Sequence, residues 1–228
     1  MNKWFERIFG SIVAVVSFSL YVMNTLFWAL PIFCFSVFKL LPITPLRKGL
    51  TWLLDACATG WVSVNTLIQR LLSPMKIRVS GDIQLSEKDW YLVLANHQSW
   101  VDIVVLQRVF NGRIPFLKFF LKEQLRYVPV LGLAWWALDF PFMKRYTKSQ
   151  LSKKPHLKGK DLETTKRSCE KFKYKPVSVM NFIEGTRFTP EKHAKQNSPF
   201  NGLLKPKSGG IGFVLTVMGE QLHKVVDV

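Results

Sequence analysis

The sequence predicts an α/β fold, with a mixed or largely parallel sheet flanked by helices, preceded by membrane-associated helices at the N-terminus. Two observations carry this prediction. No charged residue occurs in the 31 positions between Arg7 and Lys39, and residues 74–228 alternate short β-rich runs with helical patterns. We therefore expect a membrane anchor with an amphipathic helix over residues 1–73 and one α/β domain over residues 74–228.

The N-terminal apolar segment covers about residues 10–38. A helix of roughly 20 apolar residues is enough to cross a bilayer. The segment is too long for the core of a signal peptide and lacks a convincing small-residue cleavage site. We therefore expect it to be retained and inserted in the membrane.

Basic residues flank this segment on both sides, and they are Lys3, Arg7, Lys39, Arg47 and Lys48. The positive-inside rule places both flanks in the cytoplasm. A hairpin that bends near Asn24 or Pro31 fits this pattern, and a single tilted span is the alternative. Either topology predicts that residues 74–228 face the cytoplasm at the inner (cytoplasmic) membrane.

After the anchor, apolar residues recur every three or four positions from Leu50 to Leu71, which predicts an amphipathic helix. This helix is expected either at the membrane surface or against the sheet. Further along the chain we expect strands near 76–79, 91–95, 138–143, 177–183 and from 224, and helices from about 99 and over 161–172. The apolar run 128–138, with two adjacent tryptophans, suits a membrane interface, an acyl-chain channel or core packing, and we favour core packing.

Candidate chemistry begins directly after the strand at 91–95, where His97 and Asp102 stand five positions apart. A histidine that deprotonates an alcohol needs its second ring nitrogen held, and an aspartate can fix its tautomer. Positions five apart on one helix diverge by about 140°, so the two side chains meet only if His97 precedes the helix. Ser99 as N-cap would place the helix start suitably, and a purely capping role for Asp102 is the alternative.

A second polar cluster, Glu184-Gly185-Thr186-Arg187, follows the strand at 177–183. Glycine lets a backbone approach a ligand closely, and a guanidinium offers a fork of donors that matches phosphate oxygens. The cluster therefore predicts an anion-binding turn. An ordinary turn with an internal ion pair between Glu184 and Arg187 is the alternative.

Together these segments resemble the glycerolipid acyltransferase family that includes the 1-acyl-glycerol-3-phosphate (lysophosphatidate) acyltransferases. His97 and Asp102 fit its His-x4-Asp block, Glu184 to Arg187 fit its Glu-Gly-Thr-Arg block, and Phe142 to Arg145 resemble the block between them. The resemblance covers roughly residues 77–218. Ile183 replaces a common proline, Asp139 replaces a common glycine, and the chain stops at Val228 before the final block, so we expect truncation at the C-terminus.

The resemblance implies transfer of a fatty acyl group from acyl-CoA or acyl carrier protein to the free hydroxyl of lysophosphatidate, giving phosphatidate. In that scheme His97 is the general base and Asp102 orients it. The residues implied for binding the acceptor are Arg145, Glu184, Gly185, Thr186 and Arg187. Another lysophospholipid or glycerol-3-phosphate would satisfy the same residues.

The positions of the cysteines and the sequence around Ser99 argue against several other kinds of site. The three cysteines, Cys34, Cys57 and Cys169, are scattered without zinc-ligand spacing or a disulfide framework. We expect no metal, no cofactor and a reducing compartment. No Gly-x-Ser-x-Gly elbow surrounds Ser99, which argues against a serine hydrolase.

The net charge of +17 is concentrated beside the predicted site. Residues 144–175 hold twelve Lys or Arg against three acids, which gives +9 in this stretch. Such a patch suits an anionic membrane surface, the phosphates of coenzyme A or an acidic acyl carrier protein, and we expect no nucleic-acid partner. An esterase or thioesterase and a non-catalytic lipid-binding membrane protein remain as alternative functions.

Overall fold

The computed structural model describes residues 3–73, 75–81, 84–143, 163, 166 and 169–228. The chain divides into two compact units, Met1–Asp82 and Ile83–Val228. Each is described by itself below.

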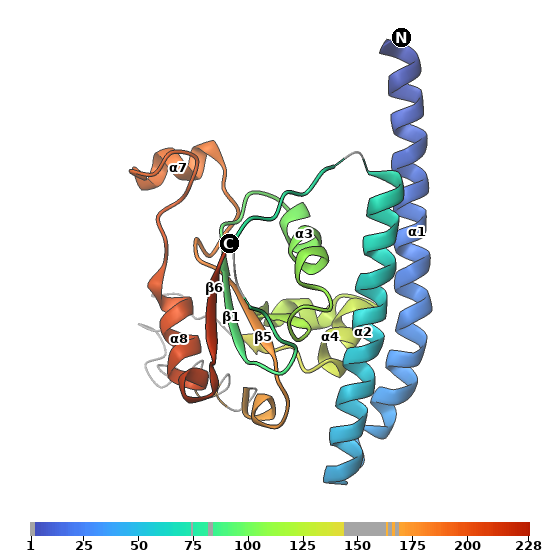
Figure 1. The fold of residues 1–228 in the computed structure, drawn as a ribbon, viewed down its shortest axis with the longest axis vertical. Helices are drawn as coiled ribbons and strands as arrows, with labels where there is room; N and C mark the ends of the chain where they lie inside the picture. Colours follow the sequence, from blue (N-terminus) through green and yellow to red (C-terminus); the bar gives the residue numbers. More distant parts are fainter. Residues whose placement is uncertain (1–2, 74, 82–83, 144–162, 164–165, 167–168) are drawn as a thin grey trace. The chain divides into compact units, whose positions relative to one another are not determined.

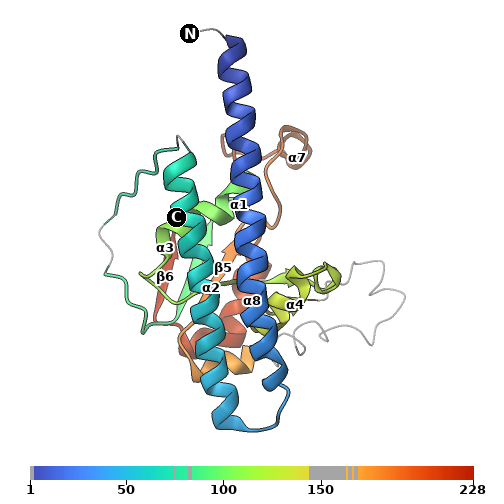
Figure 2. The same ribbon diagram turned by 90° about the vertical axis from the view of Figure 1, so that its right-hand side faces the viewer.

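The first unit is a pair of long helices, α1 (Lys3–Phe38) and α2 (Thr44–Leu72), which lie side by side in Figure 2. They are antiparallel, since Trp61 Nε1 donates to Thr25 Oγ1 at 3.1 Å and a Cβ on Gly60 would overlap the Trp28 ring. The apolar helix therefore has a small-residue contact with its neighbour.

The bend expected near Asn24 or Pro31 is wrong, because α1 runs through both positions and the chain reverses after Phe38 instead. A proline is tolerated inside an apolar helix of this kind. Asn24 has a different role from a bend, since its Nδ2 donates to Asn65 Oδ1 at 2.8 Å and to the Trp61 carbonyl at 3.0 Å. The buried amide thus joins α1 to α2.

The amphipathic period predicted from Leu50 is confirmed as α2, whose buried positions include Leu54, Ala58 and Val62. The sequence pattern identified the buried stripe but not its partner, which is α1. Among the described residues, α1 contains the one helix long and apolar enough to cross a membrane, over Arg7–Phe38.

The second unit is an α/β fold, as predicted, around a four-stranded parallel sheet of order β2-β5-β1-β6. Its strands are β1 (Tyr91–Ala95), β2 (Leu117–Phe119), β5 (Ser178–Phe182) and β6 (Lys224–Asp227). A two-stranded parallel sheet pairs β3 (Leu121–Lys122) with β4 (Phe142–Met143). All-parallel pairing buries both faces of a sheet, which explains the near-continuous apolar run of β1.

Helices cover both faces of the larger sheet, with α3 on one side and α8 on the other in Figure 1. The helices and 3-10 turns are α3 (Val101–Phe110), η1 (Glu123–Tyr127), α4 (Leu131–Ala137), η3 (Glu170–Tyr174), α7 (Pro190–Gln196), α8 (Ser208–Met218) and η4 (Gly219–Gln221). Tyr91 and Val93 pack with Leu106 on the α3 side, while Leu92 packs with Val214 on the other. A Cβ on Gly210 would come within 2.9 Å of Asn181 Nδ2, so α8 lies close to β5 at that point.

Several expected elements differ from the structure. Residues 76–79 form no strand, and the expected strand at 138–143 is reduced to Phe142–Met143. The helix expected over 161–172 falls largely outside the described residues, and Glu170–Tyr174 is a 3-10 turn. β-branched composition alone does not make a strand where no neighbour pairs with it.

Candidate active site

The predicted site residues converge where β1 and β5 end. These strands are paired in parallel with Ala95 opposite Phe182, so His97 and Glu184 each follow two residues after the last paired position. Two hydrogen bonds lock the segments together: Ile183 N donates to the Ala95 carbonyl at 3.1 Å, and Phe188 N donates to the His97 carbonyl at 2.8 Å. The carboxyl edge of a parallel sheet is where α/β proteins bind their ligands.

His97 and Asp102 are in direct contact, with His97 Nδ1 at 2.9 Å from Asp102 Oδ2. The contact forms because α3 begins at Val101, which leaves His97 in the preceding loop and puts Asp102 in the first turn. The same Oδ2 accepts the backbone N–H groups of Gln98 at 2.7 Å and Ser99 at 2.8 Å. Asp102 is therefore both the acid at the helix start and the partner of the histidine.

Ser99 is not the N-cap that the sequence predicts, because the cap position is Trp100. Its hydroxyl instead accepts from Val101 N at 3.1 Å and donates to Asp102 Oδ1 at 3.3 Å. Ser99 thus holds the carboxylate and the first turn of the helix.

The surroundings of Asp102 favour its charged form, and the carboxylate is placed to accept a hydrogen bond from His97 Nδ1. Burial raises the pKa of Asp102, but hydrogen bonds from Ser99, His97 and Gln98 outweigh it and hold that pKa below its ordinary value. A carboxylate that accepts from Nδ1–H leaves a lone pair on Nε2. Within the described part of the chain His97 Nε2 makes no hydrogen bond.

Two aromatic side chains neighbour the His97 ring. It is buried and stacks on Phe182 with centroids 3.9 Å apart and planes 13° apart. The ring of Trp100 meets it edge-on at 6.4 Å. The imidazole therefore has one orientation, which is a requirement for a general base.

Glu184 and Gly185 form a tight turn at the end of β5. Gly185 has a φ of 68° and its N–H donates to the Phe182 carbonyl at 2.9 Å, a conformation that favours glycine. Glu184 is fully buried, and neither carboxylate oxygen has a hydrogen-bond partner among the described residues. The predicted alternative of a Glu184–Arg187 ion pair is therefore absent from this structure.

Arg187 projects from the same turn toward the histidine side of the site. Its guanidinium lies over the Trp100 ring at 4.7 Å, and Trp100 is the residue that also borders His97. The guanidinium is exposed, so its remaining donors are available to an anion. One aromatic side chain thus connects the candidate base with the candidate anion ligand.

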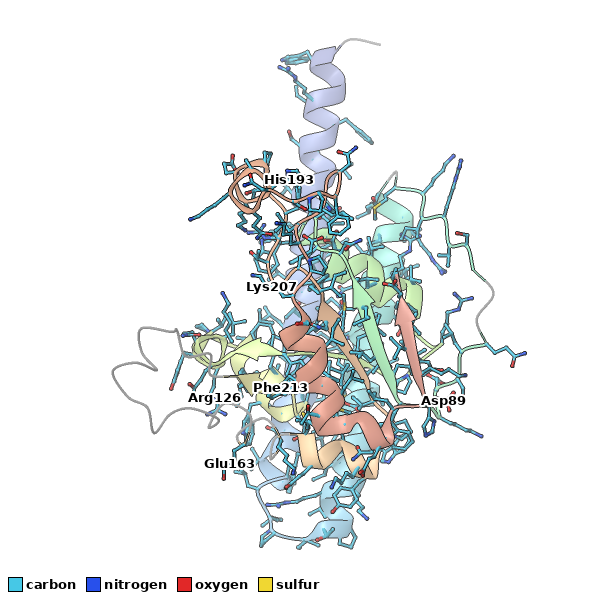
Figure 3. The ribbon with its side chains drawn as sticks, turned by 90° about the vertical axis from the view of Figure 1, so that its left-hand side faces the viewer. Asp89, Arg126, Glu163, His193, Lys207 and Phe213 are labelled. Atoms are coloured by element: carbon cyan, nitrogen blue, oxygen red, sulfur yellow. The ribbon has the colours of Figure 1, made fainter. Side chains whose placement is uncertain are left out.

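Two lysines join the turn that the sequence did not single out as site residues. Lys192 Nζ donates to Thr186 Oγ1 and to the Arg187 carbonyl, both at 2.9 Å. Lys207 N donates to the Ile183 carbonyl at 2.8 Å, and its aliphatic chain lies along Gly185, where an added Cβ would be 3.3 Å from Cδ and 3.7 Å from Nζ. Lys207 is labelled in Figure 3, as is His193, the residue that follows Lys192 in the sequence.

The structure therefore gathers His97, Asp102 and the Glu184–Arg187 turn at one edge of the sheet. Arg145, the other predicted phosphate ligand, lies outside the described residues. Asp139, which replaces a glycine in the middle block, is buried and has a φ of 58°, the backbone region that glycine prefers. The described residues include no group of three or more His, Cys, Asp or Glu that could hold a metal ion.

Two curated proteins are similar to this chain in sequence. The chain is 29% identical over 134 residues to a 1-acyl-sn-glycerol-3-phosphate acyltransferase 3 of Arabidopsis thaliana, a match that covers 55% of this chain and 32% of that protein. It is also 29% identical over 130 residues to a 1-acyl-sn-glycerol-3-phosphate acyltransferase of Saccharomyces cerevisiae, covering 56% of this chain and 38% of that one. The chain thus spans about a third of the length of these relatives.

The fold is also that of a solved acyltransferase. The crystal structure of the 1-acyl-sn-glycerophosphate acyltransferase PlsC from Thermotoga maritima matches with a TM-score of 0.52 and 19% identity, over 92% of this chain and 71% of that one. A family model described as Acyltransferase matches residues 76–217, which is more than half of the chain and includes every predicted site residue. The resemblance seen in the motifs is confirmed, and the chain belongs to the acyltransferase family.

Proposed function

We propose that this protein transfers a fatty acyl group from a thioester, acyl-CoA or acyl carrier protein, to the free hydroxyl of lysophosphatidate and so forms phosphatidate. The observation that carries the proposal is the position of His97, held at Nδ1 by Asp102, beside the exposed guanidinium of Arg187. The names of the Arabidopsis and yeast relatives support the choice of acceptor.

In the proposed reaction, His97 Nε2 takes the proton of the acceptor hydroxyl while that oxygen attacks the thioester carbonyl. The resulting imidazolium is stabilised by the Asp102 carboxylate. The tetrahedral intermediate then collapses, the carbon–sulfur bond breaks, and the thiolate leaves with the proton from His97. General-base assistance of this kind contributes about 10²- to 10⁴-fold to the rate.

The acceptor phosphate is proposed to bind at the Glu-Gly-Thr-Arg turn. Arg187 supplies a charged fork of donors, and Lys207 adds a second cation along Gly185. Lys192 holds Thr186 and the Arg187 carbonyl in place. Arg145 is proposed as a further phosphate ligand on the basis of the motif in which it stands.

Glu184 differs from the other residues of this turn. Its side chain is fully buried, so it does not reach solvent in this structure. Glu184 could contact the acceptor directly only if the turn opened. A supporting role for its buried carboxylate beneath the turn requires no such opening.

The scheme needs no acyl-enzyme. Burial raises the pKa of Cys169 to about 12, so this thiol is not a nucleophile at neutral pH. Cys34 lies in α1 and Cys57 in α2, in the other unit of the chain. The reaction also needs no cofactor beyond the acyl thioester itself.

We propose further that α1 anchors the protein in the cytoplasmic membrane with the catalytic unit facing the cytoplasm. The apolar span Arg7–Phe38 supports insertion, and the basic residues on both flanks of the segment support this orientation. Acyl thioesters are delivered from that side, and the basic surface suits both anionic lipids and the phosphates of coenzyme A.

The test uses the full chain in liposomes with oleoyl-CoA and lysophosphatidate, following phosphatidate and free fatty acid by mass spectrometry. We expect phosphatidate from the unmodified protein and none above background from His97→Ala, with His223→Ala as the matched histidine control. Free fatty acid without phosphatidate would identify a thioesterase. Product only with glycerol-3-phosphate or another lysophospholipid would change the acceptor and keep the chemistry.

A further inference from the structure

A small helical excursion connects β3 and β4, the strands of the two-stranded sheet. The two strands pair in parallel, with Leu121 opposite Phe142, and η1 and α4 lie between them. Gly132 closes the excursion, because its N–H donates to the Val128 carbonyl at 2.8 Å and an added Cβ would overlap the Arg126 carbonyl. Arg126 in turn lies over the Phe142 ring at 5.0 Å. These contacts hold η1 and α4 close to each other and to β4.

Five large apolar side chains of this excursion are open to solvent. Tyr127 is 79% exposed, Leu133 is 47% exposed, and three further large apolar side chains are each 37% exposed. We call these five residues the η1–α4 surface, and they are Tyr127, Val130, Leu131, Leu133 and Trp136. Core packing was the favoured interpretation of this run, and it holds only for Gly132, Ala137 and Leu138.

The backbone turns sharply at Val130, directly before α4. Val130 has a φ of 63° and a ψ of −58°, and Leu131 N donates to the Pro129 carbonyl across it at 2.6 Å. This is the rare form of the γ-turn, and a β-branched residue is poorly suited to it. Such strain persists only where the surrounding structure enforces it, and it often marks a functional segment.

The composition of the surface indicates what covers it. Tyr and Trp mixed with aliphatic side chains are typical of the boundary between lipid and water. Two exposed cations, Lys122 and Arg126, flank the apolar residues, and Glu123 is the acidic residue of η1. Apolar side chains that insert and basic side chains that meet headgroups are complementary to an anionic leaflet.

We propose that the η1–α4 surface docks the Ile83–Val228 unit onto an anionic bilayer, as a membrane contact separate from the apolar helix α1. A bilayer is a more fitting occupant than a protein, because the same chain carries a helix able to span one. This docking does not depend on the reaction proposed above, so its first test does not measure catalysis.

The opposite edge of the sheet provides a matched control. The strand order places β6 at the edge farthest from β2, which leads into β3 and the excursion. Val225 on β6 is 57% exposed, comparable to Leu133. Figure 3 shows Arg126 and Asp89, the latter bonded to residues at the start of β6, on opposite sides of this unit.

The experiment labels single cysteines with an environment-sensitive fluorophore in the full chain, in liposomes that contain phosphatidylserine. Cys34→Ser removes the exposed native thiol, and Leu133→Cys and Val225→Cys introduce the two label positions. We expect a blue-shifted emission that nitroxide-labelled lipids quench at position 133, with little quenching at 225. Absence of lipid quenching at 133, or equal quenching at both positions, would overturn the proposal. A blue shift without lipid quenching would show that protein covers the surface and would also overturn it.

A second measurement uses Leu133→Asp. Activity on vesicle-borne lysophosphatidate should fall about tenfold, the loss expected from one half-buried leucine, while activity on a water-soluble short-chain lysophosphatidate stays within twofold. Equal loss on both substrates would contradict docking by this surface. If the protein has no activity on either substrate, the proposed function fails while the labelling result still decides the docking proposal.

Discussion

The described residues include two histidine–aspartate pairs with the same 2.9 Å separation, one at each end of strand β1. His97 meets Asp102 just beyond the carboxyl end of β1, and His223 meets Asp89 just before its amino end. The first histidine side chain is 11% exposed and the second is 48% exposed. Distance alone does not distinguish a catalytic pair from a structural one.

The surroundings of the two carboxylates make the difference. Asp102 accepts from two backbone N–H groups, the Ser99 hydroxyl and the histidine, and no lysine of the described residues is bound to it. Asp89 forms an ion pair with Lys224 at 3.0 Å and accepts from Tyr91 OH at 3.3 Å. The Lys224 ammonium already satisfies the charge of Asp89, whereas Asp102 is left to stabilise an imidazolium. The comparison supports the proposal that the pair at the carboxyl edge of the sheet is catalytic, whereas the pair at the amino edge holds β6 in place.

The largest expected effect is the contrast between the two histidines. His97→Ala should lower kcat for acyl transfer by about 10²- to 10⁴-fold, because the general base is lost. His223→Ala should stay within about twofold, since it removes one exposed contact far from the site. Steady-state rates in liposomes measure both variants. A similar loss in both would remove the distinction between the two ends of the sheet.

The next effect concerns the cation at the carboxyl edge. Arg187→Ala should raise KM for lysophosphatidate by roughly 10- to 100-fold, the usual worth of a hydrogen bond to a charged group. Arg187→Lys should recover only part of this, because a lysine cannot reproduce the fork of donors. Lys195→Ala, an exposed cation on α7, is the control and should leave KM unchanged. A change confined to kcat would place Arg187 elsewhere in the reaction.

A smaller effect is expected from alanine substitutions at two glycines with positive φ, one in the candidate site and one outside it. Gly185→Ala places a Cβ at a φ of 68° and within 3.3 Å of Lys207 Cδ. Gly202→Ala introduces the same strain at a φ of 69° with no atom within 4 Å. Each should destabilise the fold by about 1–2 kcal/mol. Only Gly185→Ala should also lower activity, so equal activity in the two variants would show that the turn tolerates displacement.

The smallest effect is the pH dependence of the pair at the amino edge. Hydrogen bonds from His223 and Lys224 hold the pKa of Asp89 below its ordinary value, with burial opposing them. A lowered pKa contributes stability above the unfolded-state value and loses it as pH falls through the folded-state value. Thermal melts should therefore show Asp89→Asn less stable than the unmodified protein at neutral pH. The gap should close as the pH falls below the ordinary pKa of an aspartate and the carboxylate becomes protonated.

The control for this measurement is Asp227→Asn, an exposed position at the far end of β6. Its melting temperature should follow that of the unmodified protein at each pH. A gap for Asp89→Asn that widened on acidification would reverse the sign of the linkage and contradict the ion pair.

The sequence predicted the elements whose signals are local. β1 and α3 were foreseen within two residues because an apolar run meets a polar turn and then an amphipathic period. The His97–Asp102 contact was foreseen as well, since both residues stand at one strand–helix junction. Glu184 to Arg187 follow β5 directly, and parallel pairing of β5 with β1 brings them to the same edge.

What the sequence missed depends on distant neighbours. Lys207 lies beside Gly185 because its backbone N–H forms a hydrogen bond with the Ile183 carbonyl. No sequence spacing predicts a contact between such distant positions. Residues 76–79 have the composition of a strand and no partner strand. The 128–138 run is apolar enough for a core, yet composition does not say whether another element covers its outer face. In each case the tertiary environment, and not the local pattern, decides.

The most direct test of the account is a double-mutant cycle on His97 and Asp102, measured as kcat for phosphatidate formation. The account holds that the pair acts as one unit, so Asp102→Asn alone should cost a large factor, and the double variant should be no slower than His97→Ala alone. Losses that multiply in the double variant would show that the two residues act independently, and would contradict the assignment of Asp102 as the residue that orients the base.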